Sequence, residues 1–158
     1  MVLYTVKETI EREKLLEQND KVLVAFSGGP DSLCLWDILL RLAPSYNLTI
    51  YAAHLNHMIR GYDAQMDAMF CYDFCEKNGV NFFLKVIDVP KLAKQTGMSM
   101  ENCARQQRYS LFYDIKNELG INKIAVAHNL DDQAETVLLK LFRGSGLQGL
   151  SGMDYIRD

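Results

Sequence analysis

The chain has 158 residues, of which 49% are hydrophobic, and this is enough for one globular domain with a sizeable core. Its net charge of −3 excludes a bulk electrostatic attraction to nucleic acid. No apolar run approaches the length of a membrane-spanning helix and the N-terminus lacks a signal-peptide pattern, so we expect a cytoplasmic protein with no membrane partner.

The first predicted elements are a helix, a strand and a second helix. Residues 3–18 have apolar side chains roughly on one side and predict a leading helix, to which we assign no chemistry. The unbroken apolar run at 22–26 predicts a strand buried on both faces of a parallel sheet. A helix with apolar residues at helical spacing begins at Pro30, and we expect Pro44 to end it.

The turn between this strand and this helix predicts a phosphate cradle. Gly28 and Gly29 permit positive φ and a close approach of the backbone to a ligand. Amide groups and the helix dipole at the helix start favour a bound anion. No lysine follows the glycines, which excludes a loop of the G-x-x-x-x-G-K-[ST] type. An ordinary turn capped by Ser27 or Asp31 is the alternative.

A second buried strand is predicted over 48–55, and a polar loop follows at its carboxyl end. Ligands bind at this end of the strands in open α/β sheets. His54, Asn56, His57 and Arg60 are more polar groups than a solvated turn requires. We therefore interpret this loop as functional.

The next elements are a helix over 62–78 with Gly79 at its C-terminal end, a strand over 80–87, and a short polar helix before Gly97. A longer helix begins at Ser99 and ends before Gly120.

The first turns of this longer helix carry charged side chains. Glu101 and Arg105 are four residues apart, as are Arg105 and Tyr109, so these three residues share a helix face, and Arg108 lies beside them. A surface ion pair explains Glu101 and Arg105 as well as a functional role does.

Cysteines stand at positions 34, 71, 75 and 103, with no Cys-x-x-Cys pair and no zinc spacing. Cys71 and Cys75 lie one helical turn apart, beside Phe70 and Phe74. We interpret them as reduced core residues, with a metal role as the alternative.

A fourth strand over 123–127 leads directly into His128, and apolar residues between 130 and 141 predict a further helix. Asp132 and Glu135 are three residues apart, so both carboxylates lie on one face at the start of that helix. Acids that complement the helix dipole are the alternative. Because a histidine and acids follow a strand end, we interpret them as a binding constellation, with glycine-rich residues 143–153 as a loop over the site.

Strands alternate with helices four times, which predicts a three-layer α/β fold: a parallel sheet with helices on both faces and right-handed crossovers. The polar clusters after the first, second and fourth strands would then gather along one edge of the sheet. We expect the chemistry at that edge.

Five motifs, in this order and spacing, resemble the tRNA(Ile)-lysidine synthetase family: SGGPDS at 27–32, LNHMIRG at 55–61, E-x-x-AR-x-x-RY at 101–109, AHNLDDQAET at 127–136 and RGSGLQGLSGM at 143–153. The resemblance covers residues 22–153, and AHxxDDQAET is its most specific part. SGGxDS alone indicates only the superfamily of ATP pyrophosphatases, which also contains GMP synthetases, NAD synthetases and tRNA thiolases. The implied fold is the adenine nucleotide alpha hydrolase-like fold of the PP-loop ATPases.

The resemblance implies a ligase that uses ATP and Mg²⁺. Such an enzyme adenylates the C2 oxygen of the wobble cytidine of isoleucine tRNA, and the ε-amine of free L-lysine then displaces AMP to give lysidine. The loop would hold the β- and γ-phosphates, and Asp31 would hold the metal ion. The residues expected at the nucleotide are Ser27, Gly28, Gly29, Pro30, Asp31, Ser32, Asn56 and Arg60.

The catalytic residues that we expect are Asp31, Arg105, Arg108, His128, Asp132 and Glu135. Arg105 or Arg108 would steady the α-phosphate. Acids suit the amines of lysine, and His128 would either receive a proton or hold the lysine carboxylate. Asn129 stands where the family often has a second histidine, so we assign it no role.

We expect residues 1–158 to form one N-terminal catalytic domain, because the family continues into C-terminal regions that bind tRNA. Isoleucine tRNA would then contact mainly those regions, and a homodimer is one candidate oligomeric state. One alternative is a tRNA thiolase of the same superfamily, for which the cysteine spacing offers no cluster site. The other is a non-catalytic ATP-binding module.

Overall fold

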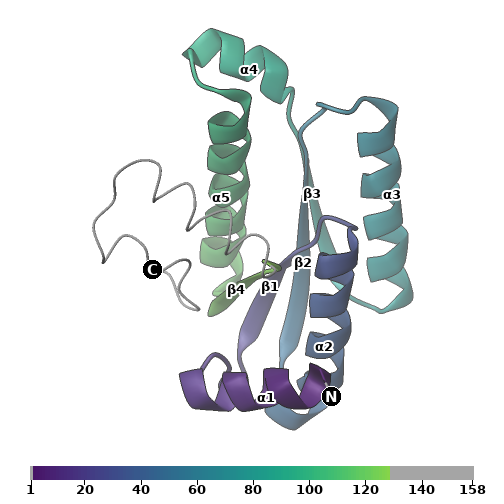
Figure 1. Ribbon diagram of the computed structural model, residues 1–158, viewed down its shortest axis with the longest axis vertical. Coiled ribbons are helices and arrows are strands. Elements are labelled where there is room, and N and C mark those ends of the chain that lie inside the picture. Colours follow the sequence, from purple (N-terminus) through teal and green to yellow (C-terminus); the bar gives the residue numbers. More distant parts are fainter. Residues whose placement is uncertain (1, 129–158) are drawn as a thin grey trace. The chain divides into compact units, whose positions relative to one another are not determined.

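The computed structural model describes residues 2–128 (Figure 1). Asp132, Glu135, the helix predicted after the fourth strand and the glycine-rich loop at 143–153 lie outside the described residues. Backbone contacts divide the chain into two compact units, one of residues 18–126 and one of residues 1–17 with 127–158. The expectation of a single catalytic domain over 1–158 stays a prediction.

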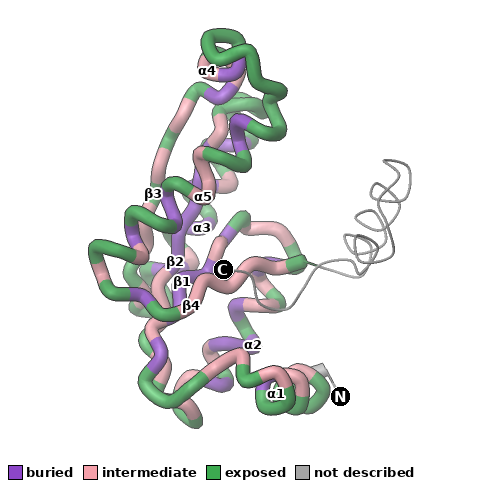
Figure 2. The backbone as a smooth tube through the Cα atoms, turned by 90° about the vertical axis from the view of Figure 1, so that its left-hand side faces the viewer, coloured by how far each residue is buried: buried purple, intermediate pink, exposed green. Residues whose placement is uncertain are grey.

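The unit of residues 18–126 is built on a parallel sheet. Its strands are β1 (Lys21–Ala25), β2 (Thr49–Asn56), β3 (Asn81–Val86) and β4 (Lys123–Val126), in the order β3-β2-β1-β4. Every pairing is parallel, and Val24 stands opposite Ala52 on one side and Ala125 on the other. Buried residues concentrate in β1 and β2, as the apolar runs predicted (Figure 2).

Helices cover both faces of this sheet, which confirms the three-layer prediction (Figure 1). The ring of Phe26 at the end of β1 lies 5.3 Å from that of Trp36 in α2 (Pro30–Tyr46) and 5.4 Å from that of Phe74 in α3 (Tyr62–Lys77). On the opposite face, Leu23 and Ala53 pack with Phe112 of α5 (Met100–Leu119). The short helix α4 (Val89–Thr96) packs against the first turns of α5.

β3 forms one edge of the described sheet. Its side chains Leu84 and Val86 are 48% and 54% exposed, although both are apolar. An apolar groove of about 790 Å³ runs between β3 and α3, and its lining includes Met69, Phe82 and Leu84.

Two predicted helix ends are wrong. The leading helix α1 (Val2–Glu13) stops five residues before position 18, because Lys14 has a φ of 52° and the amide of Leu15 donates to the carbonyl of Ile10 at 3.0 Å. This bond closes the last helical turn.

Pro44 does not end α2, which continues to Tyr46. The proline removes only the one bond that its own N–H would have made. The chain turns at Asn47, which has φ 51° and ψ 46°, and its amide donates to the carbonyl of Ala43.

The remaining predicted helices and strands in the described part agree with the structure to within one residue at each end. Within residues 2–128, no helix has the length and apolar character needed to cross a membrane.

Candidate functional site

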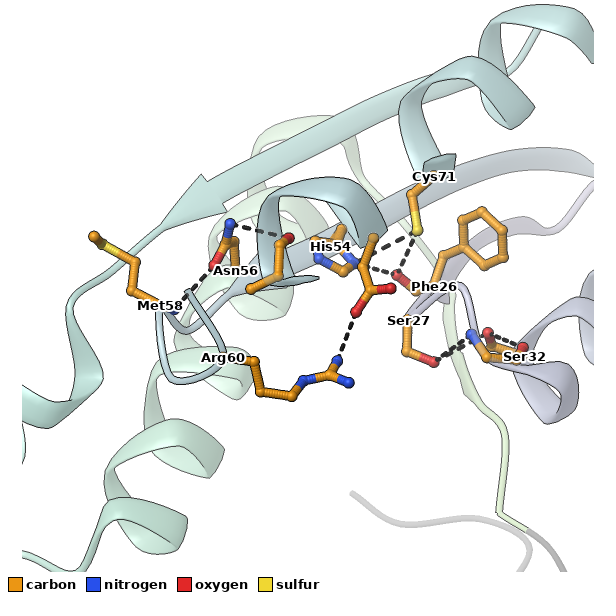
Figure 3. A network of polar contacts seen from close by, with 11 residues as sticks. Phe26, Ser27, Ser32, His54, Asn56, Met58, Arg60 and Cys71 are labelled. Atoms are coloured by element: carbon orange, nitrogen blue, oxygen red, sulfur yellow. Dashed lines mark hydrogen bonds and ion pairs between the residues drawn. The ribbon is translucent and has the colours of Figure 1, made fainter. Parts of the chain in front are cut away.

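The loop after β1 is shaped by two serine hydroxyl groups (Figure 3). Ser27 Oγ donates to Ser32 Oγ at 3.1 Å, and Ser32 Oγ in turn donates to the carbonyl of Gly29 at 2.9 Å. The amide of Gly29 donates back to Ser27 Oγ at 3.3 Å. Ser32 is buried, so the loop is tied to the first turn of α2 from inside.

The two glycines of this loop have different roles. Gly28 has a φ of +81°, and a Cβ there would lie 3.2 Å from Sγ of Cys71 and 3.3 Å from a ring carbon of Phe70. The positive φ and the close packing therefore both favour glycine at this position. Gly29 has a φ of −76°, and a Cβ there would meet only Ser27 Oγ, at 3.5 Å.

The start of α2 suits an anion. Gly29 is the N-cap residue and supplies no side-chain acceptor to the amides of the first turn, whereas Asp88 and Ser99 do so for α4 and α5. Pro30 occupies the first turn as predicted, and Asp31 is exposed beside it.

The loop after β2 is held by Asn56, which is buried (Figure 3). Asn56 Nδ2 donates to the carbonyl of Ala64 at 3.2 Å, and Asn56 Oδ1 accepts from the amide of Met58 at 2.9 Å. Both ends of this amide group therefore bind main chain and shape the loop. The prediction that Asn56 contacts the nucleotide stays a prediction.

Arg60 is paired with α3, the helix that packs beside the loop after β1. Its Nη2 is 2.6 Å from Oδ2 of Asp67 in α3. The carbonyl oxygen of Asp67 would in turn be 3.8 Å from a Cβ on Gly28. The structure thus brings the loops after β1 and β2 together, as the sequence predicted.

His57 connects the loop after β2 to α5. Arg108 Nη2 lies 3.3 Å from His57 Nε2, so the guanidinium donates and the imidazole accepts. Burial lowers the pKa of His57, and the neighbouring Arg108 lowers it further. A neutral imidazole is the form that can accept this hydrogen bond.

Arg105 and Arg108 differ in their surroundings. The guanidinium of Arg105 lies 5.8 Å from the centre of the Tyr109 ring and is exposed. Within the described residues, Glu101 and Arg105 form no ion pair, so the surface-pair interpretation is wrong for this conformation. Of these two arginines, Arg108 is the one with a described hydrogen bond to the loop after β2.

His54 is buried rather than part of the exposed loop, and its Nδ1 lies 2.8 Å from the carbonyl oxygen of Phe26. Sequence reasoning gave Asp67 no role and placed Cys71 in the core without a contact to the loop; the two residues lie four apart on α3. Their spacing places them on one helix face. What that face contacts depends on the packing of α3 against the sheet.

His128 follows β4 after one intervening residue, Ala127, and it is the last described residue. Its proposed partners Asp132 and Glu135 lie outside the described residues. All four cysteines carry free thiols, and Cys71, Cys75 and Cys103 are buried, in agreement with their interpretation as reduced core residues. Among residues 2–128, no three His, Cys, Asp or Glu side chains are grouped as metal ligands.

Comparison with known proteins matches residues 3–158 to a family described as the PP-loop domain. A tRNA(Ile)-lysidine synthase of Clostridioides difficile is 51% identical over the whole chain, and one of Caldanaerobacter subterraneus is 48% identical over 94% of it. The chain spans about a third of the length of these relatives, 34% and 32%.

Two solved structures share the fold. A U34-tRNA thiolase from Methanococcus maripaludis, with its [4Fe-4S] cluster, has a TM-score of 0.71 at 27% identity, and the match covers 90% of this chain and 51% of that one. An NH₃-dependent NAD synthetase from Campylobacter jejuni has a TM-score of 0.52 at 16% identity, covering 98% of this chain and 75% of that one.

Proposed function

Because the chain belongs to the PP-loop domain family, we propose that it binds ATP at residues 27–32 and uses it to activate a base of a tRNA. The relatives named tRNA(Ile)-lysidine synthase make the proposal specific. ATP adenylates the C2 oxygen of the wobble cytidine of isoleucine tRNA and releases pyrophosphate. The ε-amine of L-lysine then attacks C2 and releases AMP, which leaves lysidine.

The observation that carries this proposal is the geometry of the loop after β1. Gly28 has a φ of +81° and a Cβ there would crowd Cys71 and Phe70, and Gly29 starts α2 without a capping side chain. Backbone amides and a helix N-terminus stabilise the negative charge that pyrophosphate gains as it leaves. Ser27 and Ser32 add hydroxyl groups to the same loop.

Mg²⁺ fits the residues of this site. Asp31 places an exposed carboxylate in the first turn of α2, beside the loop. Mg²⁺ prefers oxygen ligands and is usually held by one or two carboxylates together with substrate phosphates. When bound, it would neutralise charge on the phosphates.

We assign contact with the α-phosphate to Arg108 rather than Arg105. Arg108 is hydrogen-bonded to His57 in the loop after β2, whereas Arg105 lies against the ring of Tyr109. An arginine near the α-phosphate stabilises charge that develops there during adenylation.

For the lysine substrate we propose His128, Asp132 and Glu135. Free lysine carries two ammonium groups, which carboxylates bind well. The ε-amine must lose a proton before it attacks, since its ordinary pKa is about 10.4, and a nearby carboxylate or imidazole can take that proton.

The second candidate is a tRNA thiolase, and the solved thiolase structure favours it at the level of the fold. That structure holds a [4Fe-4S] cluster. The cysteines of this chain do not form a set that could ligate such a cluster, because only Cys71 and Cys75 share an element and no three potential ligands are grouped among residues 2–128. This difference favours the ligase.

The test is pyrophosphate exchange into ATP, followed by AMP release, by the 158-residue chain at low salt and saturating isoleucine tRNA, because we expect this chain to bind tRNA weakly. We expect exchange to require isoleucine tRNA and Mg²⁺, and AMP release to require added lysine. Asp31→Asn should abolish exchange while the protein stays folded. Sulfur-dependent turnover would support the thiolase, and ATP binding with no exchange under any condition would support the binding module. Full exchange by Asp31→Asn would contradict the role of Asp31.

A further inference from the structure

The carbonyl group of Phe26 lies where β1 ends and the phosphate loop begins. Paired residues of β1 and β2 extend to Ala25 and Ala53, and the amide of Phe26 still donates to the carbonyl of Ala53 at 2.9 Å. The carbonyl of Phe26 is bound by side chains. His54 Nδ1 lies 2.8 Å from it, and Sγ of Cys71 lies 3.7 Å from it (Figure 3).

The imidazole of His54 therefore binds this carbonyl, and no described main-chain donor does so. This allows the chain to leave the sheet at Ser27 without an unsatisfied buried carbonyl, which would be costly. A carbonyl oxygen only accepts, so the hydrogen atom of His54 lies on Nδ1. His54 is 7% exposed, and burial lowers its pKa.

Cys71 connects this hydrogen bond to the glycine turn. Its Sγ lies 3.6 Å from His54 Nδ1, and 3.2 Å from the place that a Cβ on Gly28 would take. Burial raises the pKa of Cys71 to about 12, so the thiol keeps its hydrogen. Imidazole, thiol and Gly28 are thus packed together under the loop.

We propose that His54 is a positioning residue for the phosphate loop. Its Nδ1–H fixes the carbonyl of Phe26, and the next three residues then keep the conformation that receives the phosphates of ATP. This inference rests on the proposed ATP site. His54 itself does not touch the nucleotide.

The test compares two substitutions of His54 in the whole chain. His54→Asn keeps a donor at the place of Nδ1, whereas His54→Leu fills a similar volume without a donor. Cys75→Ala is the matched control, because Cys75 is fully buried in the same helix as Cys71 and has no described contact with the loop. The probe is a non-hydrolysable ATP analogue with Mg²⁺, titrated by calorimetry, alongside hydrogen exchange of the amides of residues 27–29.

We expect His54→Leu to bind the analogue about tenfold more weakly, the scale of one lost hydrogen bond, and its loop amides to exchange faster. His54→Asn should keep the wild-type affinity for the analogue and the wild-type exchange of the loop amides. Cys75→Ala should lower thermal stability without changing the affinity or the exchange. If His54→Leu does not fold, His54→Gln replaces it, since its amide nitrogen lies near the place of Nε2 and should fail to restore binding.

Equal affinity in wild type and in the variant without the Nδ1 donor would overturn the inference, whatever happens to thermal stability. A wild-type chain that binds no ATP analogue would overturn the proposed function instead. The exchange of residues 27–29 would then decide the positioning role, because unchanged exchange in His54→Leu overturns it without reference to ATP.

Discussion

At Gly28, two independent restrictions act on a single residue: a positive φ and close packing against Cys71 and Phe70, which a Cβ would crowd. The neighbouring Gly29 has neither restriction, although the sequence presents both glycines alike. The two positions therefore form a matched pair for substitution.

We predict that Gly28→Ala lowers the free energy of unfolding by about 1–2 kcal/mol or more, because a Cβ is strained at this φ and crowds Cys71. Gly29→Ala should stay within about 0.5 kcal/mol of wild type. Urea unfolding of both variants measures the difference. Equal stability of the two would show that the loop relaxes and that the positive φ is not required.

The histidines at the end of β2 predict a dependence of stability on pH. Burial is the largest cause that lowers the pKa of both His54 and His57, and Arg108 acts in the same direction. Below about pH 6.5 the unfolded chain therefore binds protons that the folded chain does not, and the free energy of unfolding falls as the pH falls. Above that pH this part of the stability is fully present.

Thermal unfolding at about pH 7.5 and pH 5.5 checks this, because the ordinary pKa of histidine lies between them. His54→Asn keeps the hydrogen bond but cannot take up a proton, so it should lose less stability on acidification than wild type does. An identical loss in both proteins would mean that His54 is not held neutral by the fold.

Among the site residues, the loop 27–32 could be predicted from sequence because its signals are local: two glycines, a proline and an acid between a strand and a helix. The role of His54 could not be predicted, because its partner Phe26 is 28 residues away and meets it only through strand pairing. The same holds for Arg108 and His57, which are 51 residues apart.

Among the elements, α5 shows how far local capping signals determine a helix. Ser99 Oγ accepts from the amide of Asn102 at 3.2 Å, and Gly120 ends the helix with a φ of 61°. Both signals are visible in the sequence, and both ends were predicted. The end of α1 was missed because Lys14, which adopts a left-handed φ, has no intrinsic preference for it.

We predict that Ser99→Ala lowers the free energy of unfolding by about 1 kcal/mol, since the amide of Asn102 loses its acceptor. Ser110→Ala is the control, because Ser110 is exposed within α5, where alanine is a better helix former. Chemical unfolding compares the two. A larger loss for the control than for the cap would refute the capping role.

For the whole molecule, net charge and chain length both bear on the affinity for tRNA. The chain carries a net charge of −3 and spans about a third of the length of its curated relatives, 34% for one of them. Electrostatic contacts with phosphates supply much of the affinity for nucleic acid, and they weaken steeply with salt.

We predict that the 158-residue chain binds ATP but holds isoleucine tRNA weakly, with an affinity that falls steeply as salt is added. Filter binding over a salt series measures this, with ATP binding on the same preparation as the control for folding. Tight retention of tRNA at physiological salt would contradict the prediction.

The exposed edge of the sheet also has a practical consequence for handling the protein. β3 presents Leu84 and Val86, 48% and 54% exposed, beside main-chain groups that no described strand pairs on that side. Unprotected apolar edges are templates for aggregation, and natural proteins often guard them with lysine. Solubility at high concentration should therefore improve with Val86→Lys. This substitution lies in β3, which β2 separates from β1 and the glycine loop that follows β1.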